Sequence, residues 1–255
     1  MKIQAIFSDY DGTLSSIEVP REKAFVPPKL FHALESASRK VPIVIITTKD
    51  LKFVSEKVPF AHAIAATCGL ELQIGTKLIS DKRAKENLSL VNEAYSESLD
   101  VVSYMKDNIV VETKTTHKGD LMGFCLDWRA SRNWRHAHNA VRPLVAKFRG
   151  RGLHVVESKF NPFVDIYAIK VEKGSAFLRL KHELGLNSPI MYLGDSEMDN
   201  PAFELAEVPI GIKHKESSPT LQCAYYVEFH DLEPFISRLL AANLNFVPEM
   251  IKRTQ

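Results

Sequence analysis

Two short acidic segments carry the residue types best suited to chemistry in this chain. The first, Asp9-Tyr10-Asp11-Gly12-Thr13-Leu14, follows the short strand-like run Ile3–Phe7 after one residue, Ser8. Residues i and i+2 of an extended segment point to the same side, so Asp9 and Asp11 can flank one reacting group. Gly12 permits the sharp turn that such a loop needs. The same segment also suits a purely structural Asx turn at the end of a strand, because Asp-Gly is a common turn sequence.

The second acidic segment, Gly194-Asp195-Ser196-Glu197-Met198-Asp199, follows another apolar run, Ile190–Leu193. Alone, it is equally typical of a helix-capping loop. Ligands of open α/β sheets gather beyond the carboxyl ends of parallel strands, which is where both segments are expected. Carboxylates that share one crevice repel each other unless a hard cation joins them, and oxygen ligands without nearby His or Cys indicate Mg²⁺. We therefore expect a Mg²⁺ site suited to phosphoryl transfer, with a lysine that also offsets phosphate charge.

The elements that must position these acids follow two patterns. In residues 1–80 and again after Val171, short apolar runs alternate with helical segments. This alternation predicts an α/β fold with a parallel sheet and right-handed crossovers. The expected strands are residues 3–7, 42–46, 64–67, 190–193, 208–212 and 225–229. One expected helix begins at Pro27-Pro28 and a second follows Asp50. Further helices are expected over residues 174–184, in a segment that contains Pro201, and over residues 232–244.

Residues 81–170 show a different pattern. Leu88, Val91 and Tyr95 begin a three- and four-residue apolar repeat that predicts a long amphipathic helix. A second such helix carries Trp134, Val141 and Phe148, and strands are expected over residues 109–112, 121–128, 153–157 and 164–169. The αββαββ order predicts an inserted α+β module at 81–170, so that the α/β core comprises 1–80 and 171–255.

The composition narrows the class of protein. Hydrophobic residues make up 45% and charged residues 25%, as in folded globular proteins, and the net charge of +2 indicates no particular partner. No apolar stretch approaches the ~20 residues that span a bilayer. Acidic residues also follow the N-terminus too soon for a signal-peptide core. The three isolated cysteines favour a reducing compartment. We therefore expect a cytoplasmic protein without a membrane partner.

With both acidic segments placed, the chain resembles the haloacid dehalogenase (HAD) superfamily of aspartate-nucleophile phosphatases. The resemblance implies a Rossmann-like core in which Asp9 is the nucleophile and Asp11 the general acid/base. Thr47 matches the hydroxyl that donates to the phosphoryl oxygens. Lys173 matches the lysine that offsets charge; it is preferred to Lys170 because Lys173-Gly174 begins a helix, as the motif does.

The resemblance also implies a ligand set for Mg²⁺ and a cap. The metal ligands would be Asp9, the backbone carbonyl of Asp11, and Asp195, with Asp199 as a further ligand or the partner of one. The module at 81–170 lies where C2-class caps lie, and its αββαββ order resembles the C2B type.

Within that class the chain is most similar to trehalose-6-phosphate phosphatases. The similarity lies in the segment Asp9–Leu14 with the nearby Pro20, and in Gly69-Leu70-Glu71-Leu72. It implies hydrolysis of a small-molecule sugar phosphate. Glu112, Lys114 and Glu157 match the family pattern of sugar contacts, and other polar residues near the site or on cap strands complete the expected substrate-binding set: Thr48, Lys49, Arg129 and Asn161.

Other functions stay open at this point. Thr47-Thr48-Lys49 stands where trehalose-6-phosphate phosphatases have Ser-Gly-Arg, so other glycosyl phosphates remain candidate substrates. A phosphomannomutase-like sugar phosphomutase would use the same core and cap. A non-enzymatic polyanion-binding protein is the third hypothesis, since residues 129–151 contain many basic residues and no acid. The solvated face of a helix explains that run equally simply, and we expect no nucleic-acid partner; the sequence does not define the oligomeric state.

Overall fold

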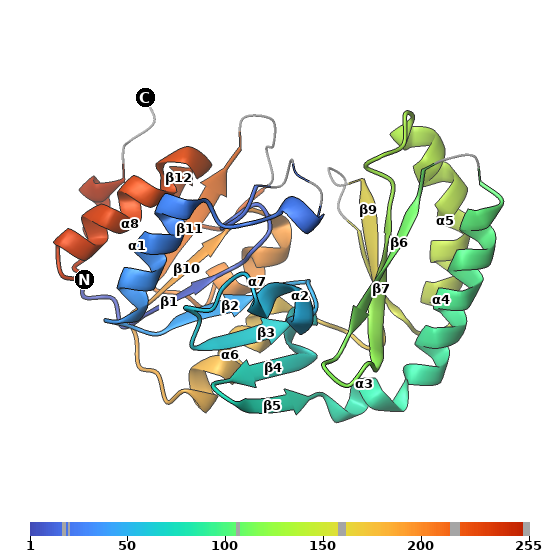
Figure 1. The fold of residues 1–255 in the computed structure, drawn as a ribbon, viewed down its shortest axis with the longest axis horizontal. Coiled ribbons are helices and arrows are strands. Elements are labelled where there is room, and N and C mark those ends of the chain that lie inside the picture. Colours follow the sequence, from blue (N-terminus) through green and yellow to red (C-terminus); the bar gives the residue numbers. More distant parts are fainter. Residues whose placement is uncertain (17–18, 20, 106–107, 158–161, 215–219, 252–255) are drawn as a thin grey trace. The chain divides into compact units, whose positions relative to one another are not determined.

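The computed structural model describes residues 1–16, 19, 21–105, 108–157, 162–214 and 220–251. It forms two compact units (Figure 1). The first comprises Met1–Lys49, Phe53–Ile79 and Glu172–Gln255, and the second comprises Asp50–Lys52 and Ser80–Val171. That the inserted module acts as a cap stays a prediction.

A sheet with parallel strands forms the centre of the first unit. In the described part of the chain it has eight strands in the order β12-β11-β10-β1-β2-β3-β4-β5. The strands from β12 to β3 all pair in parallel, which confirms the predicted α/β core. Their bounds are β1 (Ala5–Ser8), β2 (Ile43–Ile46), β3 (Ala63–Ala66), β10 (Ile190–Gly194), β11 (Val208–Lys213) and β12 (Tyr225–Glu228).

Two further strands at one edge of this sheet were not predicted. They are β4 (Glu71–Ile74), which pairs antiparallel with β3, and β5 (Lys77–Ser80). Both are only four residues long. Glu71–Ile74 alternates polar and apolar residues over the minimum length of a strand signal, and Lys77–Ser80 shows no alternation.

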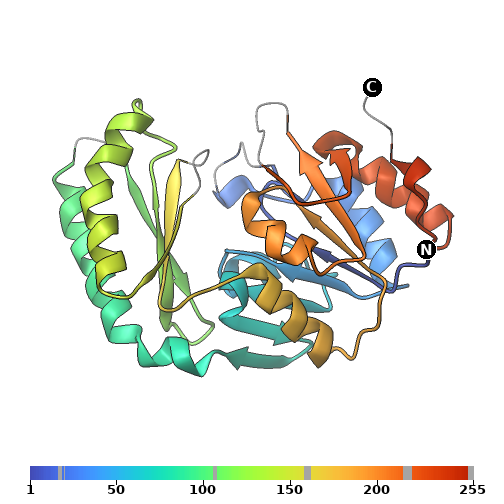
Figure 2. The same ribbon diagram turned by 180° about the vertical axis from the view of Figure 1, so that it is seen from behind.

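Helices cover both faces of the sheet. Helices α1 (Pro28–Ser38) and α8 (Leu232–Ala241) lie on one face, and α6 (Lys173–Glu183) and α7 (Asn200–Phe203) lie on the other (Figures 1 and 2). Because strand side chains alternate between faces, Phe7 and Tyr192 point towards α6 and α7 and pack with Phe177 and Phe203. The shorter helical segments are α2 (Leu51–Ser55), η1 (Arg21–Lys23), η2 (Thr67–Gly69), η3 (Glu197–Asp199), η4 (Phe229–Asp231) and η5 (Pro248–Met250).

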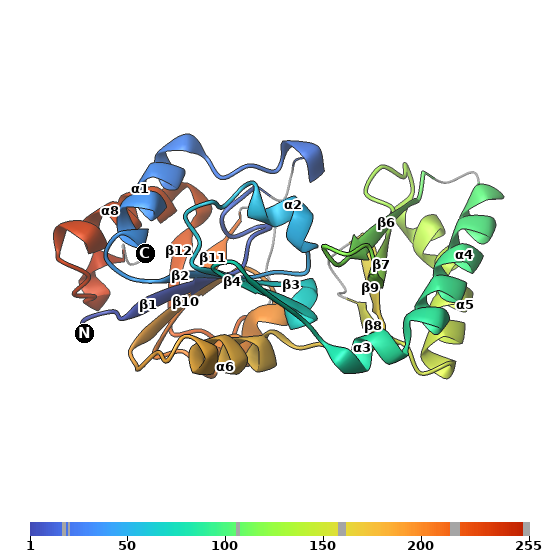
Figure 3. The same cartoon turned by 60° about the horizontal axis from the view of Figure 1, so that its bottom comes forward.

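The second unit is built around an antiparallel sheet of order β6-β7-β9-β8. Helices α4 (Leu88–Ser103) and α5 (Trp134–Gly150) pack side by side on one face of it (Figure 3), where Phe124 contacts both Tyr95 and Phe148. The strands are β6 (Val110–Thr115), β7 (Leu121–Asp127), β8 (His154–Glu157) and β9 (Phe163–Tyr167), and a short helix α3 (Lys82–Glu86) precedes α4. The order α4-β6-β7-α5-β8-β9 is the predicted αββαββ pattern.

One residue of this unit departs from the expected packing. Trp134, placed by its spacing on the apolar side of α5, is 51% exposed. It is the first residue of the helix, and its indole nitrogen donates to the Arg129 carbonyl at 3.3 Å in the preceding loop. Val141, Val145 and Phe148 form the buried side of α5 instead.

The three cysteines, Cys68, Cys125 and Cys223, are all free thiols. Among the described residues no helix combines the length and the apolar content needed to cross a lipid bilayer.

Candidate functional site

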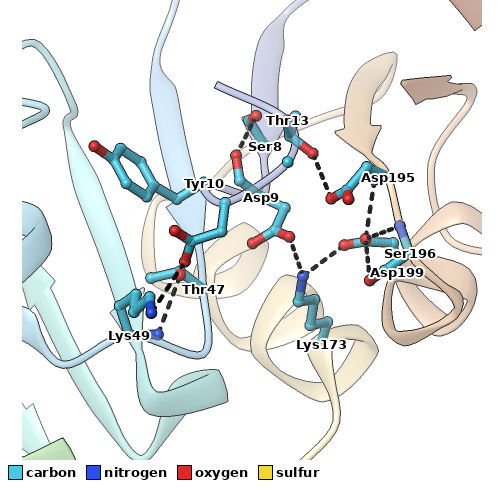
Figure 4. A network of polar contacts seen from close by, with 12 residues as sticks. Ser8, Asp9, Tyr10, Thr13, Thr47, Lys49, Lys173, Asp195, Ser196 and Asp199 are labelled. Carbon is cyan, nitrogen blue, oxygen red and sulfur yellow. Dashed lines mark hydrogen bonds and ion pairs between the residues drawn. The ribbon is translucent and has the colours of Figure 1, made fainter. Parts of the chain in front are cut away.

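Three of the predicted catalytic and metal-binding residues lie at the carboxyl ends of three neighbouring strands, at one edge of the first unit's sheet. Strand β1 lies between β10 and β2, and Asp9, Asp195 and Thr47 follow these three strands directly. Because parallel neighbours end at the same edge, residues far apart in the sequence become adjacent (Figure 4). All three residues are buried, with whole-residue exposures of 6% for Asp9, 7% for Asp195 and 0% for Thr47.

Three carboxylates converge at this edge. Asp9, Asp195 and Asp199 each present an oxygen, and these oxygens all lie within 4.8 Å of one another. Lys173, the first residue of α6, places its Nζ 2.8 Å from Asp9 Oδ2 and 2.7 Å from Asp199 Oδ1 (Figure 4). One ammonium therefore faces three buried acidic side chains.

The electrostatics of the cluster favour a cation. Burial raises the pKa of Asp9 to about 7, although Lys173 opposes the shift, and Asp199 adds to it by repulsion. Burial, followed by repulsion from Asp9 and Asp199, raises the pKa of Asp195 well above its ordinary value. Ionisation of the whole cluster would leave negative charge that Lys173 alone does not balance. An all-oxygen donor set of this charge fits Mg²⁺.

Asp199 is the member of the cluster most fully engaged by protein donors. Its Oδ1 accepts hydrogen bonds from Lys173 Nζ and from the Tyr192 hydroxyl, both at 2.7 Å. Its Oδ2 accepts from the backbone N–H groups of Asp195 and Ser196 at 3.2 and 3.0 Å, and from Ser196 Oγ at 3.0 Å. With both oxygens occupied in this way, Asp199 is suited to holding Lys173 and the Asp195 loop in place.

Two glycines leave space for the carboxylates of the cluster. Gly12 has a φ of 76°, and a Cβ added there would overlap the Asp195 carboxylate. A Cβ at Gly194 would lie 2.5 Å from Asp199 Cγ. Thr13 Oγ1 donates to Asp195 Oδ1 at 3.1 Å and ties the two loops together. Gly12 therefore permits the close approach of the two loops, and Gly194 permits Asp199 to fold back within the second loop.

Asp11 lies apart from the three converging carboxylates. Its Oδ2 is 3.8 Å from Lys49 Nζ, and its side chain is 29% exposed while that of Lys49 is 11% exposed. The backbone N–H of Lys49 donates to Thr47 Oγ1 at 3.2 Å, and Thr48, between them, is half-buried. Tyr10 points away from the cluster (Figure 4), and its hydroxyl donates to the Ala24 carbonyl at 2.5 Å. The structure thus gives Asp9 and Asp11 different surroundings.

Of the substrate-binding residues predicted in the second unit, Glu112 and Lys114 share one sheet face. Glu112 pairs in register with Cys125, which pairs with Asp165, so these side chains point away from the face that carries Phe124. Lys114 Nζ lies 3.0 Å from Asp165 Oδ1, and both side chains are buried.

The remaining predicted residues of this unit do not join that pair. Glu157 pairs in register with Val164, which places it on the opposite sheet face, where it forms an ion pair with Arg149 of α5. Arg129 is bound to Asp127, with 2.5 Å between Nη2 and Oδ2. Asn161 lies outside the described residues.

Several residues that contact the cluster were not singled out from the sequence. Thr13 and Ser196 lie inside the two acidic segments, and their hydroxyls were the available signal. Tyr192 carries the one hydroxyl in the otherwise apolar strand β10, and this hydroxyl was the available signal for a buried polar partner.

Comparison with known proteins relates the chain to phosphatases. No protein-family model matches it. It is 28% identical over 216 residues to probable trehalose-phosphate phosphatase J of Arabidopsis thaliana, a match that covers 78% of this chain and 56% of that protein. It is 26% identical over 237 residues to the trehalose-phosphate phosphatase of Mycobacterium bovis, covering 87% of this chain and 57% of that protein. The chain spans just over half the length of these curated relatives.

Solved structures show the same fold. A trehalose-6-phosphate phosphatase related protein superposes with a TM-score of 0.73 at 16% identity, over 94% of this chain and 98% of that one. A sugar phosphatase of HAD subclass IIB superposes with a TM-score of 0.63 at 13% identity, over 95% of this chain and 100% of that one. The chain has the HAD fold, and the similarity to trehalose-phosphate phosphatases expected from the sequence is confirmed.

Proposed function

We propose that this protein is a Mg²⁺-dependent phosphatase that hydrolyses a sugar phosphate through an aspartyl-phosphate on Asp9. The observation that carries the proposal is the position of the Asp9 carboxylate, buried beside Lys173 and within reach of Asp195 at the carboxyl edge of the sheet. The names of the curated relatives support the sugar-phosphate class, and trehalose-6-phosphate is the leading candidate.

In the first step, an Asp9 carboxylate oxygen attacks phosphorus and the bond between phosphorus and the sugar oxygen breaks. Lys173 holds Asp9 and offsets negative charge on the nucleophile and the phosphoryl group. The Thr47 hydroxyl, at the end of β2, is the proposed donor to a phosphoryl oxygen. Mg²⁺ held by Asp9, Asp195 and the Asp11 carbonyl would supply further neutralisation of phosphoryl charge.

Asp11 is the proposed general acid and base. It gives its proton to the departing sugar oxygen, and it then takes a proton from the water that attacks the aspartyl-phosphate and releases inorganic phosphate. Lys49 Nζ lies 3.8 Å from Asp11 Oδ2. The separate surroundings of Asp9 and Asp11 support this division of roles, because the nucleophile stays beside Lys173 while the acid stays outside the cluster.

A small set of polar side chains supplies the proposed contacts to the sugar. Glu112 and Lys114, which share one face of the second unit's sheet, are the proposed sugar contacts of that unit, together with Thr48 and Lys49 in the first. The basic run 129–151 carries part of its charge in ion pairs with acidic residues, which does not favour a polyanion-binding function. Lys147 and Arg151 both pair with Glu97, and Arg149 pairs with Glu157.

Phosphate release from a panel of phosphate esters tests the function. The panel contains trehalose-6-phosphate, sucrose-6-phosphate, mannosyl-3-phosphoglycerate and mannose-6-phosphate, each assayed with Mg²⁺ and with EDTA, and with Asp9→Asn as the blank. We expect Mg²⁺-dependent release with one preferred sugar phosphate. Conversion of a sugar phosphate to its isomer without phosphate release would replace the proposal by a mutase. No reaction, together with salt-dependent binding of nucleic acid, would replace it by a binding function.

A further inference from the structure

His214 contacts the loop that carries the proposed nucleophile, although it comes from a different part of the sheet. It directly follows β11, and its Nε2 lies 2.5 Å from the Gly12 carbonyl oxygen. A carbonyl oxygen only accepts hydrogen bonds, so Nε2 carries the hydrogen and donates it. The imidazole ring stacks on Phe229, with 5.2 Å between ring centroids and 28° between ring planes. The ring is therefore held between the end of β12 and the loop after β1.

Residues that follow three different strands contact one another at the Gly12 peptide. Gly12 itself follows β1, the Asp195 carboxylate after β10 occupies the space where a Gly12 side chain would lie, and His214 after β11 binds the Gly12 carbonyl. The next residue, Thr13, donates its hydroxyl hydrogen to Asp195 Oδ1 at 3.1 Å. A rotation of the Gly12–Thr13 peptide would therefore displace the Thr13 hydroxyl and change the space available to Asp195.

We infer that His214 is a positioning residue for the proposed phosphatase site. Its hydrogen bond fixes the Gly12–Thr13 peptide, and through it the orientation of Asp195 and of the adjacent Asp11 backbone, the proposed ligands of Mg²⁺. The inference rests on the proposed function for its effect on turnover, and on the geometry of the loop for its effect on metal binding. His214 acts through Gly12 and has no role in bond making or proton transfer.

Two substitutions separate the hydrogen bond from the packing of the ring. His214→Phe keeps an aromatic ring for the contact with Phe229 but has no donor for the Gly12 carbonyl. His214→Gln keeps an N–H donor at similar reach and loses the ring. Phe229→Leu is the matched control, since it weakens the stacking contact and leaves the His214 donor in place.

The experiment measures three quantities for each purified variant at one fixed pH: the Mg²⁺ dissociation constant by calorimetry without substrate, kcat and KM for an aryl phosphate, and the thermal midpoint. For His214→Phe we expect kcat to fall roughly 10- to 100-fold, Mg²⁺ to bind several-fold more weakly, and the thermal midpoint to change little. His214→Gln should recover most of both losses.

The outcomes distinguish failure of the positioning role of His214 from failure of the proposed phosphatase function. Unchanged Mg²⁺ affinity and kcat in His214→Phe would overturn the positioning role. So would a His214→Gln variant that is as impaired as His214→Phe, because ring packing would then explain both. A wild-type protein that binds Mg²⁺ but hydrolyses no phosphate ester would overturn the proposed function, and the calorimetric comparison would still decide the role of His214.

Discussion

Lys173 and Asp9 form an ion pair of 2.8 Å in which the two side chains are only 1% and 9% exposed. The same ammonium contacts Asp199 at 2.7 Å. Desolvation makes buried carboxylates costly to leave without a cation, so Asp9 and Asp199 both depend on Lys173 for their place in the fold. The relationship links the first residue of α6 to the end of the central strand and determines how the cluster responds to mutation, pH and metal.

Removal of the Lys173 charge should destabilise the metal-free protein strongly. In Lys173→Met, Asp9 and Asp199 would remain buried without the cation between them, and we expect the free energy of unfolding to fall by about 3–5 kcal/mol. Chemical denaturation in EDTA measures this. Lys181→Met on the same helix is the control, because Lys181 is partly exposed and lies 3.9 Å from Glu207; its cost should stay below about 1 kcal/mol. Equal losses in the free energy of unfolding for the two variants would contradict a stabilising role for Lys173 between the two buried carboxylates.

Asp9→Asn should abolish turnover and leave the fold intact. The amide is close in shape to the carboxyl group but is not a competent nucleophile. The measurements are phosphate release with saturating substrate and Mg²⁺, and the circular dichroism spectrum. Retention of more than a trace of activity in protein purified away from other phosphatases would remove Asp9 from its proposed role.

The stability of the metal-free protein should fall as pH rises from about 4 to about 7. Burial raises the pKa of Asp9 from 3.8 to about 7 in the folded protein. In this interval the folded state binds more protons than the unfolded state, so the free energy of unfolding decreases with rising pH and levels off above about 7. Asp9→Asn removes this contribution, so its stability relative to wild type in EDTA should increase over the same interval. A difference that does not vary with pH would show that Asp9 titrates normally.

Added Mg²⁺ should counteract the fall in stability between about pH 4 and about pH 7. Binding requires ionised carboxylates and competes with their protons, so affinity should rise with pH through the same interval. Calorimetry in buffers of different ionisation enthalpy should detect protons released on binding near pH 6.

Gly12→Ala should disrupt metal binding through a steric conflict. An alanine Cβ would overlap the Asp195 carboxylate, in addition to the strain of a side chain at φ 76°. Gly75→Ala is the matched control: its φ is 56° and no atom lies within 4 Å of the added Cβ. We expect both variants to lose about 1 kcal/mol of stability from backbone strain, and only Gly12→Ala to lose Mg²⁺ affinity. Similar affinities in both variants would contradict the close contact of the two loops.

Lys114 should matter for the stability of the second unit, whatever its part in sugar binding. Its ammonium lies 3.0 Å from Asp165 Oδ1, with exposures of 5% and 3%. Lys114→Met should cost about 3–5 kcal/mol, and addition of Asp165→Leu should recover part of that loss. Glu157→Ala breaks a more exposed pair with Arg149 and should cost less than about 1 kcal/mol. The predicted sugar contact of Glu157 has a separate readout, a KM that rises for the sugar phosphate and not for an aryl phosphate.

The sequence by itself determined the order of the elements and the places of both acidic segments. Runs such as Ile43–Ile46 are continuously apolar and rich in β-branched residues, as buried parallel strands require. The change to three- and four-residue spacing after residue 81 marked the inserted module. Asp9 and Asp195 were recognisable because each comes at the end of a mostly apolar strand, and strand ends are local features.

Only the tertiary structure decided which atoms of these segments meet. The contacts of Thr13 with Asp195 and of His214 with Gly12 join residues that follow different strands, and no spacing along the chain specifies them. Strand register likewise separated Glu157 from Lys114, because a shift of one residue moves a side chain to the other face of a sheet. Local patterns specify elements through backbone preference and burial, whereas side-chain partners follow from packing that involves the whole unit.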